Sequence, residues 1–168
     1  MELEALFAEH RDAVFRYLAR YTGDPDLAED LVQETFLKLA TRPPRTRDQV
    51  KGWLFVVATN LAKDALKTSR RRGELARLAS EDAPLQSPVD PGALLERAEL
   101  RRRVRAALEG LSHKERTALL LREEGFGHRE IAAAVGTTTG SVGTLVARAL
   151  AKLGRVLDAG EGKEGSAP

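Results

Sequence analysis

The chain contains no cysteine, and its 168 residues include only three histidines and 5% aromatic residues. Without cysteine, disulfides, thiolate metal sites and cysteine nucleophiles are excluded. The histidines are scattered, so we expect no histidine-based metal site and no cofactor. The N-terminal segment carries acidic residues and lacks a long apolar run, which predicts neither a signal peptide nor membrane insertion. We therefore expect a soluble, cytoplasmic protein.

Charged residues make up 31% of the chain and apolar residues 42%, with 27 basic and 25 acidic side chains giving a formal net charge of +2. Residues 79–92 hold three of the seven prolines and show no apolar periodicity, which predicts a flexible linker. The segment 158–168 is similarly loose and is expected to be disordered. Two folded blocks, 1–78 and 93–157, remain. Neither shows the alternation of a strand, so the expected fold is all-α with two small helical domains.

The first block reads as three helices. Apolar residues recur at helical spacing up to Tyr21, Gly23 interrupts them, and Asp24 with Pro25 has the pattern of an N-cap followed by the first helical position. The second helix is expected over about 25–40. Two prolines in 41–48 require a loop, and the third helix is expected over about 49–70.

The second block begins with a basic helix and continues with a Ser112–Glu115 capping box, which predicts the start of the next helix. Residues 128–147 then show the spacing of a helix-turn-helix. A small residue, Ala132, is available where the two helices would touch, and Gly136 allows the tight turn four residues later. Such a motif places its second helix in the major groove of DNA, whereas an ordinary pair of packed helices is the simpler alternative.

Charge is divided sharply within the first block. Residues 2–34 contain nine acidic and three basic residues, whereas residues 35–77 contain three acidic and eleven basic residues. On a helical wheel of residues 25–40, the expected buried side comprises Leu27, Leu31, Val32, Phe36 and Leu39, and the opposite side comprises Asp26, Asp30, Gln33, Glu34 and Leu37. An exposed leucine among acids is typical of an interface with a basic partner, although a plain solvated face is the alternative.

The outward side of the third helix is expected to carry Thr59, Asn60, Lys63, Lys67 and Arg70, continuing into Arg71 and Arg72. Trp53 stands at the edge of this side. Cations beside an aromatic ring suit single-stranded DNA, because they neutralise phosphates and offer a surface on which a base can stack. For Trp53 itself, a place in the hydrophobic core is an equally good interpretation.

Enzyme chemistry is not expected. Ser112 and His113 are sequence neighbours whose spacing fits a helix cap rather than a nucleophile and its base. The GEGKEG segment near the end follows no strand and lacks the spacing of a phosphate-binding loop. Asp30 and Glu34 share a helical side, but no third ligand or pocket is indicated near them.

Three segments together resemble a bacterial RNA polymerase sigma factor of the extracytoplasmic-function group of the sigma-70 family. They are AEDLVQETFLKL (28–39), VKGWLFVVATNLAKDALKTSRRR (50–72) and LSHKERTALLLREEGFGHREIAAAVGTTTGSV (111–142). The resemblance covers about 1–78 and 93–155, in the order of the family and with its linker between. It implies that the first block is a region 2-like helical bundle and the second a region 4-like helix-turn-helix domain.

The resemblance also implies partners and sites. The first block would dock on the β′ clamp of core RNA polymerase, and its third helix with the preceding loop would capture a flipped base of the −10 element. The second block would read the −35 element of promoter DNA and touch the β flap, and an anti-sigma factor would be a further partner. The implied docking residues are Asp30, Leu31, Gln33, Glu34, Phe36 and Leu37. The −10 residues are Trp53, Asn60, Lys63, Lys67, Arg70 and Arg71, and the −35 residues are Arg129, Thr138, Thr139, Ser141, Thr144 and Arg148.

The sequence departs from the family pattern in its final helix. Gly143, Leu145 and Leu150 occupy positions where the family usually has Lys or Arg, which leaves Arg148 and Lys152 as the main cations. Fewer phosphate contacts predict weaker −35 binding with a flatter salt dependence, so promoter choice would depend on the −10 side or on an auxiliary protein. Two other functions therefore stay open, a stand-alone dimeric helix-turn-helix regulator and a sigma-like protein with weakened −35 recognition.

Overall fold

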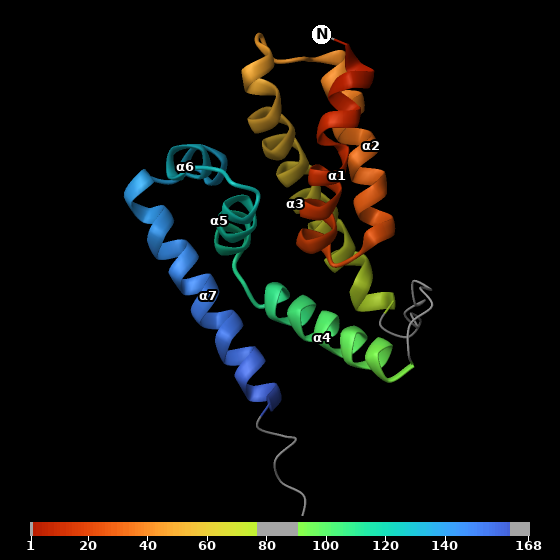
Figure 1. The fold of residues 1–168 in the computed structure, drawn as a ribbon, viewed down its shortest axis with the longest axis vertical. Coiled ribbons are helices and arrows are strands. Elements are labelled where there is room, and N and C mark those ends of the chain that lie inside the picture. Colours follow the sequence, from red (N-terminus) through yellow and green to blue (C-terminus); the bar gives the residue numbers. More distant parts are fainter. Residues whose placement is uncertain (1, 77–90, 162–168) are drawn as a thin grey trace, which may run out of the picture.

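The computed structural model describes residues 2–76 and 91–161, with side chains described for 2–69 and 92–159. Within these ranges the chain is helical, and no strand occurs, which confirms the all-α fold class (Figure 1). The elements are α1 (Leu3–Thr22), α2 (Pro25–Thr41), the 3-10 helix η1 (Arg47–Gln49), α3 (Val50–Ala76), α4 (Pro91–Glu109), α5 (His113–Glu123), α6 (His128–Val135) and α7 (Thr139–Glu161).

Helices α1, α2 and α3 form the first bundle. Local sequence signals determine where these helices begin and end. The carboxylate of Asp24 accepts hydrogen bonds from the amides of Asp26 (3.0 Å) and Leu27 (3.1 Å), as expected of an N-cap. Gly23 ends α1 at a φ of +69°, in the left-handed region that favours glycine. The core of this bundle includes Tyr17, Leu18 and Leu54, which are 1% exposed or less.

Helix α3 is longer than expected. It begins at Val50, directly after η1, and its backbone continues to Ala76, six residues beyond the expected end at Arg70. Residues 77–90 lie outside the described part of the chain, so the expected linker is not described apart from its last two residues, which begin α4.

Helices α4 to α7 form the second bundle. The capping box at the start of α5 is confirmed, because Ser112 Oγ accepts from the Glu115 amide (3.2 Å) while the Ser112 amide donates to Glu115 Oε2 (3.0 Å). Gly136, with a φ of +73°, turns the chain between α6 and α7. Helix α7 continues to Glu161, so residues 158–161, expected to be disordered, are helical.

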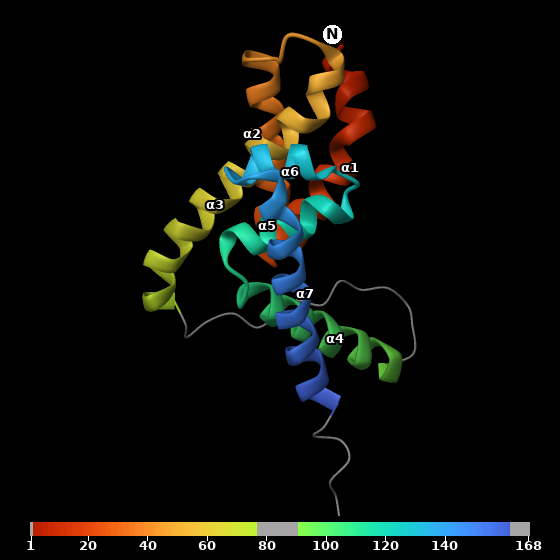
Figure 2. The same ribbon diagram turned by 90° about the vertical axis from the view of Figure 1, so that its left-hand side faces the viewer.

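The helix-turn-helix packs as the sequence spacing predicts. Ile131 and Val142 are fully buried, and the small residue Ala132 is 5% exposed where α6 meets α7. The two bundles also contact each other, because α5 packs against α1 and α3, and α4 reaches α1 (Figures 1 and 2). The second bundle therefore lies beside the first rather than apart from it.

Candidate nucleic-acid and protein interfaces

The outward side of α2 is an acidic face, which we define as Asp26, Asp30, Gln33, Glu34 and Leu37. All five side chains are exposed, and Leu37 is 65% exposed although it is apolar. Glu34 is partly neutralised by Lys38 one turn later, at 3.8 Å. An apolar side chain within a ring of carboxylates can be desolvated by a partner that brings its own cations.

Two of the docking residues implied by the resemblance do not lie on this face. Leu31 is 5% exposed and Phe36 is 4% exposed, and the Phe36 ring packs against Phe7 with their centroids 4.9 Å apart. Both side chains therefore belong to the hydrophobic core, as the helical wheel predicts. They hold α2 in place from the core, so their side chains support the acidic face rather than form its surface.

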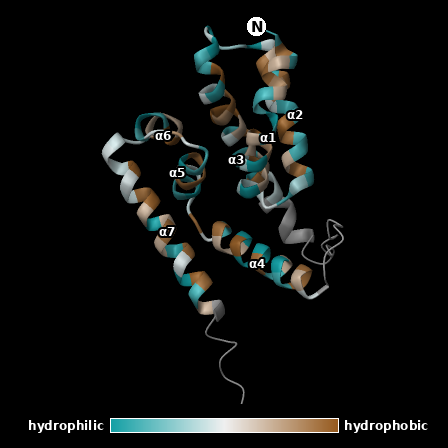
Figure 3. Ribbon diagram, in the orientation of Figure 1, coloured by the Kyte–Doolittle hydropathy of each residue, from teal (hydrophilic) through white to brown (hydrophobic). Residues whose placement is uncertain are grey.

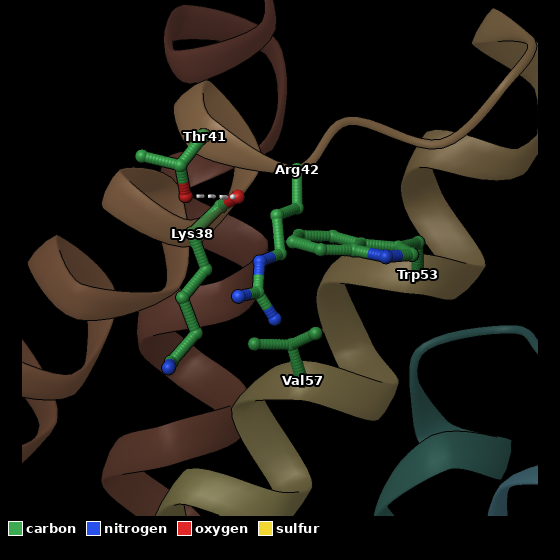
Figure 4. A pocket seen from close by; sticks show the side chains of 5 residues that line it. All are labelled: Lys38, Thr41, Arg42, Trp53 and Val57. Atoms are coloured by element: carbon green, nitrogen blue, oxygen red, sulfur yellow. Dashed lines mark hydrogen bonds between the residues drawn. The ribbon is translucent and has the colours of Figure 1, made fainter.

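Trp53 lies at the wall of a surface pocket of about 380 Å³, where α2 ends and α3 begins. We call this the indole pocket and define it by Lys38, Thr41, Arg42, Trp53 and Val57 (Figure 4). The Arg42 side chain extends alongside the indole ring, whereas the Lys38 side chain runs along α2 on the other side of the pocket, with its Nζ 3.8 Å from Glu34 (Figure 4). The indole is half-buried, so part of its surface remains accessible.

Sequence reasoning missed Lys38 and Arg42 as members of this site. Lys38 belongs to α2, whose outward side is otherwise acidic, and Arg42 precedes the two prolines of the loop. The only available signal was the concentration of basic residues after position 35, because helix periodicity does not show which of them line a pocket with Trp53.

Only some of the residues expected on the outward side of α3 are exposed. Asn60 and Lys67 are exposed, whereas Lys63 is half-buried. Thr59, expected on the outward side, is instead 3% exposed, and its hydroxyl lies 2.6 Å from Tyr17 Oη. The side chains of Arg70 and Arg71 lie outside the described part of the structure.

Around the helix-turn-helix, the polar residues expected at DNA lie at the surface. Arg129, Thr138, Thr139, Thr144 and Arg148 are exposed, and Ser141 is half-buried with its hydroxyl 2.7 Å from that of Thr138. These side chains lie at the start of α6, in the turn, and along the first half of α7. Thr139, Ser141 and Thr144 thus lie in the N-terminal part of the second helix, where such motifs make base contacts.

Lys152, the second cation expected on α7, is engaged within the protein. Its Nζ lies 2.7 Å from Oε2 of Glu115, whose side chain is buried. This hydrogen bond is the main cause of a lowered pKa at Glu115. Arg148 is therefore the cation that the first half of α7 offers to DNA. The number of α7 cations available to phosphates is lower than the sequence indicates.

Neither a metal centre nor a membrane span is found in the described ranges. The described residues hold no group of three potential ligands from His, Asp and Glu. The helices within 2–76 and 91–161 are also too short or too polar to cross a bilayer.

Each of the two bundles matches a known protein family. Residues 6–72 match Sigma-70 region 2, and residues 101–153 match Sigma-70, region 4. SigL of Mycobacterium tuberculosis (strain ATCC 25618 / H37Rv), described as an ECF RNA polymerase sigma factor, is 34% identical over 146 residues. The match covers 83% of this chain and 80% of SigL. The chain belongs to the extracytoplasmic-function group of the sigma-70 family. As an RNA polymerase sigma factor it directs the initiation of transcription, and its family is not a family of enzymes.

Further relatives also match this chain over most of their length. The RNA polymerase sigma factor CarQ of Myxococcus xanthus is 32% identical over 157 residues, covering 92% of this sigma factor and 88% of CarQ. Among solved structures, the sigma factor RpoE in complex with the anti-sigma factor NepR from Bartonella quintana superposes with a TM-score of 0.70 at 25% identity. The superposition covers 92% of this chain and 96% of that chain. CnrH in complex with the cytosolic domain of CnrY shares the fold, with a TM-score of 0.66 at 24% identity over 94% of this chain and 88% of that chain.

The match of the first bundle to region 2 decides between two of the open functions. A stand-alone helix-turn-helix regulator has no use for a separate bundle with an acidic face, whereas a sigma factor needs both bundles. The expected weakening of −35 recognition is a question within the family, and it depends on α7.

Proposed function

We propose that this sigma factor docks on the β′ clamp of core RNA polymerase through the acidic face of α2. The observation that carries the proposal is Leu37, 65% exposed on a helix side otherwise occupied by Asp26, Asp30, Gln33 and Glu34. A partner with an apolar spot ringed by cations would complement it in shape and charge. Leu31 and Phe36 support this face from the core.

The indole pocket is the site that we assign to a flipped base of the non-template −10 strand. It offers an aromatic ring for stacking, with Arg42 beside the ring and Lys38 across the pocket for the phosphates. Asn60, Lys63 and Lys67 continue the polar and basic surface along α3, and Arg70 and Arg71 extend it in the sequence. Stacking a base on the indole would hold the melted strand without any covalent chemistry.

The helix-turn-helix is assigned to the −35 element, with weak phosphate binding. Thr138, Thr139, Ser141 and Thr144 supply hydroxyls, Arg129 and Arg148 supply charge, and Lys152 is held by Glu115. Because phosphate contacts provide much of the affinity for duplex DNA, most of the promoter affinity would come from the −10 side and from polymerase itself.

Additional partners follow from the same assignment. Helices α4 and α7, which diverge in Figure 1, each carry exposed apolar side chains, with Leu95 (72%) and Leu100 (55%) on α4 and Leu150 (52%) on α7 (Figures 1 and 3). Exposed leucines on either helix could be covered by the β flap of polymerase. An anti-sigma factor is a further partner, because the superposing RpoE is bound to one. The protein would act in the cytoplasm, where polymerase is found.

Docking is tested by gel filtration with core polymerase lacking sigma. The wild type should co-elute with the core enzyme, whereas the double variant Asp30→Lys/Glu34→Lys should elute alone, because four units of charge change on the acidic face. A matched control, Glu4→Lys/Glu123→Lys, makes the same charge change at exposed positions of α1 and α5 and should co-elute. Equal co-elution of the wild type and both variants would refute docking through α2.

A further inference from the structure

The indole pocket combines an aromatic wall with cationic side chains. Among the described residues, it is lined by Lys38, Thr41, Arg42, Trp53 and Val57, and none of these side chains is a carboxylate. Its volume of about 380 Å³ lies within the range of small-molecule sites, about 300–1,000 Å³. A pocket with these walls can receive a planar group and can distinguish one such group from another by the acceptors along its edge.

Arg42 is the side chain of this pocket that can contact the edge of a stacked base. Figure 4 shows its guanidinium group beside one end of the indole ring. A base that stacks on the indole lies parallel to the ring, so one of its edges can face this guanidinium. The backbone amide of Arg42 donates to the Lys38 carbonyl at 2.8 Å, but within the described residues the guanidinium forms no hydrogen bond or ion pair. Its N–H donors are therefore available to a ligand.

The other two polar side chains of the pocket are already engaged within the protein. Thr41 Oγ1 donates to two backbone carbonyls of α2, both at 3.2 Å. Lys38 Nζ lies 3.8 Å from Glu34 Oε1, so part of its charge is neutralised. Arg42 is therefore the group that contributes most to selecting a ligand, and it contributes donors only.

A guanidinium that offers only donors matches the acceptors of guanine. The Hoogsteen edge of guanine presents O6 and N7 side by side, and a guanidinium donates to both at once. Adenine has an amine in place of O6, and thymine offers O4 beside a methyl group. Cytosine has O2 and N3, but its N3 lies next to an amine that would face the cations of this pocket without an acceptor. The chemistry of the pocket thus favours guanine over the other three bases.

We propose that the indole pocket selects guanine at one position of the melted −10 strand, and that Arg42 determines this choice. The inference rests on the assignment of the pocket to a flipped base, and it adds which base is bound and which atoms recognise it. The Trp53 ring stacks on any base, because every base has a π face. Arg42 donates to O6 and N7 of guanine, and its remaining N–H donors stay available to a phosphate of the same strand.

Single strands that carry one base isolate this contact. The strands are about 12 nucleotides long, within the site sizes of single-strand binders, and are abasic at every position except one. That position carries guanine, thymine, cytosine, adenine or no base. Because the phosphates are the same in all five strands, differences in affinity for the full-length chain report the base alone. In fluorescence anisotropy, the guanine strand should bind about tenfold more tightly than the adenine and cytosine strands, as expected of one bidentate contact.

The same strands separate this inference from the assignment of the pocket to a flipped base. Tightest binding of another base, or equal binding of all four bases above the strand without a base, would overturn guanine selection and leave base capture in place. Equal affinity of all five strands would overturn both. A strand with 7-deazaguanine, which lacks N7, should lose the preference, whereas hypoxanthine, which keeps O6 and N7, should retain it. An undiminished affinity for 7-deazaguanine would overturn the contact at N7.

Variants of Arg42 test whether this residue makes the choice. Arg42→Lys keeps the charge but loses the bidentate geometry, so its affinity for the guanine strand should fall to that for the other bases. Arg42→Gln should prefer adenine instead, because an amide pairs with N6 and N7 of adenine. Arg45→Lys makes the matched change at another exposed arginine, in the 41–48 loop, and should keep the guanine preference. A guanine preference retained in both Arg42 variants would overturn the role of Arg42.

Discussion

Arg42 lies beside the ring of Trp53 and Lys38 lines the same pocket, although neither belongs to the helix whose cations the sequence singles out. We expect Arg42→Ala and Lys38→Ala each to weaken binding of a fluorescein-labelled 12-nucleotide single strand and to reduce its salt slope by about 0.7. Trp53→Ala should cost about 1–3 kcal/mol, because a stacking surface is lost. Fluorescence anisotropy measures both, and Lys114→Ala serves as the cation control. Equal losses in the three cation variants, with no loss in Trp53→Ala, would indicate non-specific charge binding only.

The ion pair between Glu115 and Lys152 predicts that Lys152 contributes to stability rather than to DNA binding. Lys152→Ala leaves the buried Glu115 carboxylate with fewer partners and should destabilise the protein by about 1–2 kcal/mol. Duplex DNA affinity should change little, whereas Arg148→Ala should reduce the salt slope of duplex binding by about 0.9. Thermal unfolding and filter binding separate the two effects. A reduced salt slope for Lys152→Ala would show that Lys152 contacts phosphate after all.

The same pair predicts a pH dependence. The pKa of Glu115 is lowered in the folded protein, chiefly by its hydrogen bond from Lys152. This stabilisation is therefore complete above the ordinary carboxyl range near pH 4.5 and is lost as the pH falls through the lowered pKa. Thermal melts between pH 7 and pH 3 should show a smaller acid destabilisation for Lys152→Ala than for the wild type. Identical profiles would mean that the ion pair contributes nothing to acid stability.

Among the helices, α7 is the one whose composition departs most from its proposed role. A Cβ at Gly143 would meet no atom within 4 Å, so Gly143→Lys should fit without rearrangement. It should stabilise α7 by roughly 1 kcal/mol through helix propensity and steepen the salt slope of duplex binding by about 0.9. Gly154→Lys, equally open but farther along α7, should give the stability without the DNA effect. Equal DNA affinity of both variants would place the first half of α7 away from the duplex.

Helix ends were predictable from the sequence because their causes are local. The caps at Asp24 and Ser112 and the turn at Gly136 each depend on a residue and its near neighbours. The acidic face of α2 was predictable for the same reason, since a helical wheel needs only the spacing.

The remainder depends on tertiary contacts that spacing does not encode. Thr59 is buried because Tyr17, 42 positions earlier, provides a hydrogen-bond partner, and Lys152 is held by Glu115, 37 positions earlier. Arg42 reaches Trp53 only because the 41–48 loop returns α3 beside the end of α2. The residues misplaced from the sequence alone are thus those whose surroundings are formed by side chains of a second helix.

At the contact between the two bundles, His113 of α5 faces Tyr21 of α1, Lys63 and Lys67 of α3, and Arg116 of its own helix. The pKa of His113 is lowered, first by burial and then by these cations. Because the folded protein favours neutral His113, the contribution of His113 to stability is complete above about pH 6.5 and is lost as the pH falls below it. The melting temperature should therefore fall between pH 7.5 and 5.5, and His113→Gln should flatten this change. An equal fall in His113→Gln would assign the effect to other groups.

The most direct test of the central claim, that this chain gives core polymerase its choice of start site, is transcription from a random duplex library with sequencing of RNA 5′ ends. Core enzyme with the wild-type chain should produce discrete 5′ ends preceded by shared sequence at −10 and a weaker signal at −35. The Asp30→Lys/Glu34→Lys variant should produce only the scattered ends of core enzyme alone. The account would be contradicted if the wild-type chain left the 5′ ends of core enzyme unchanged.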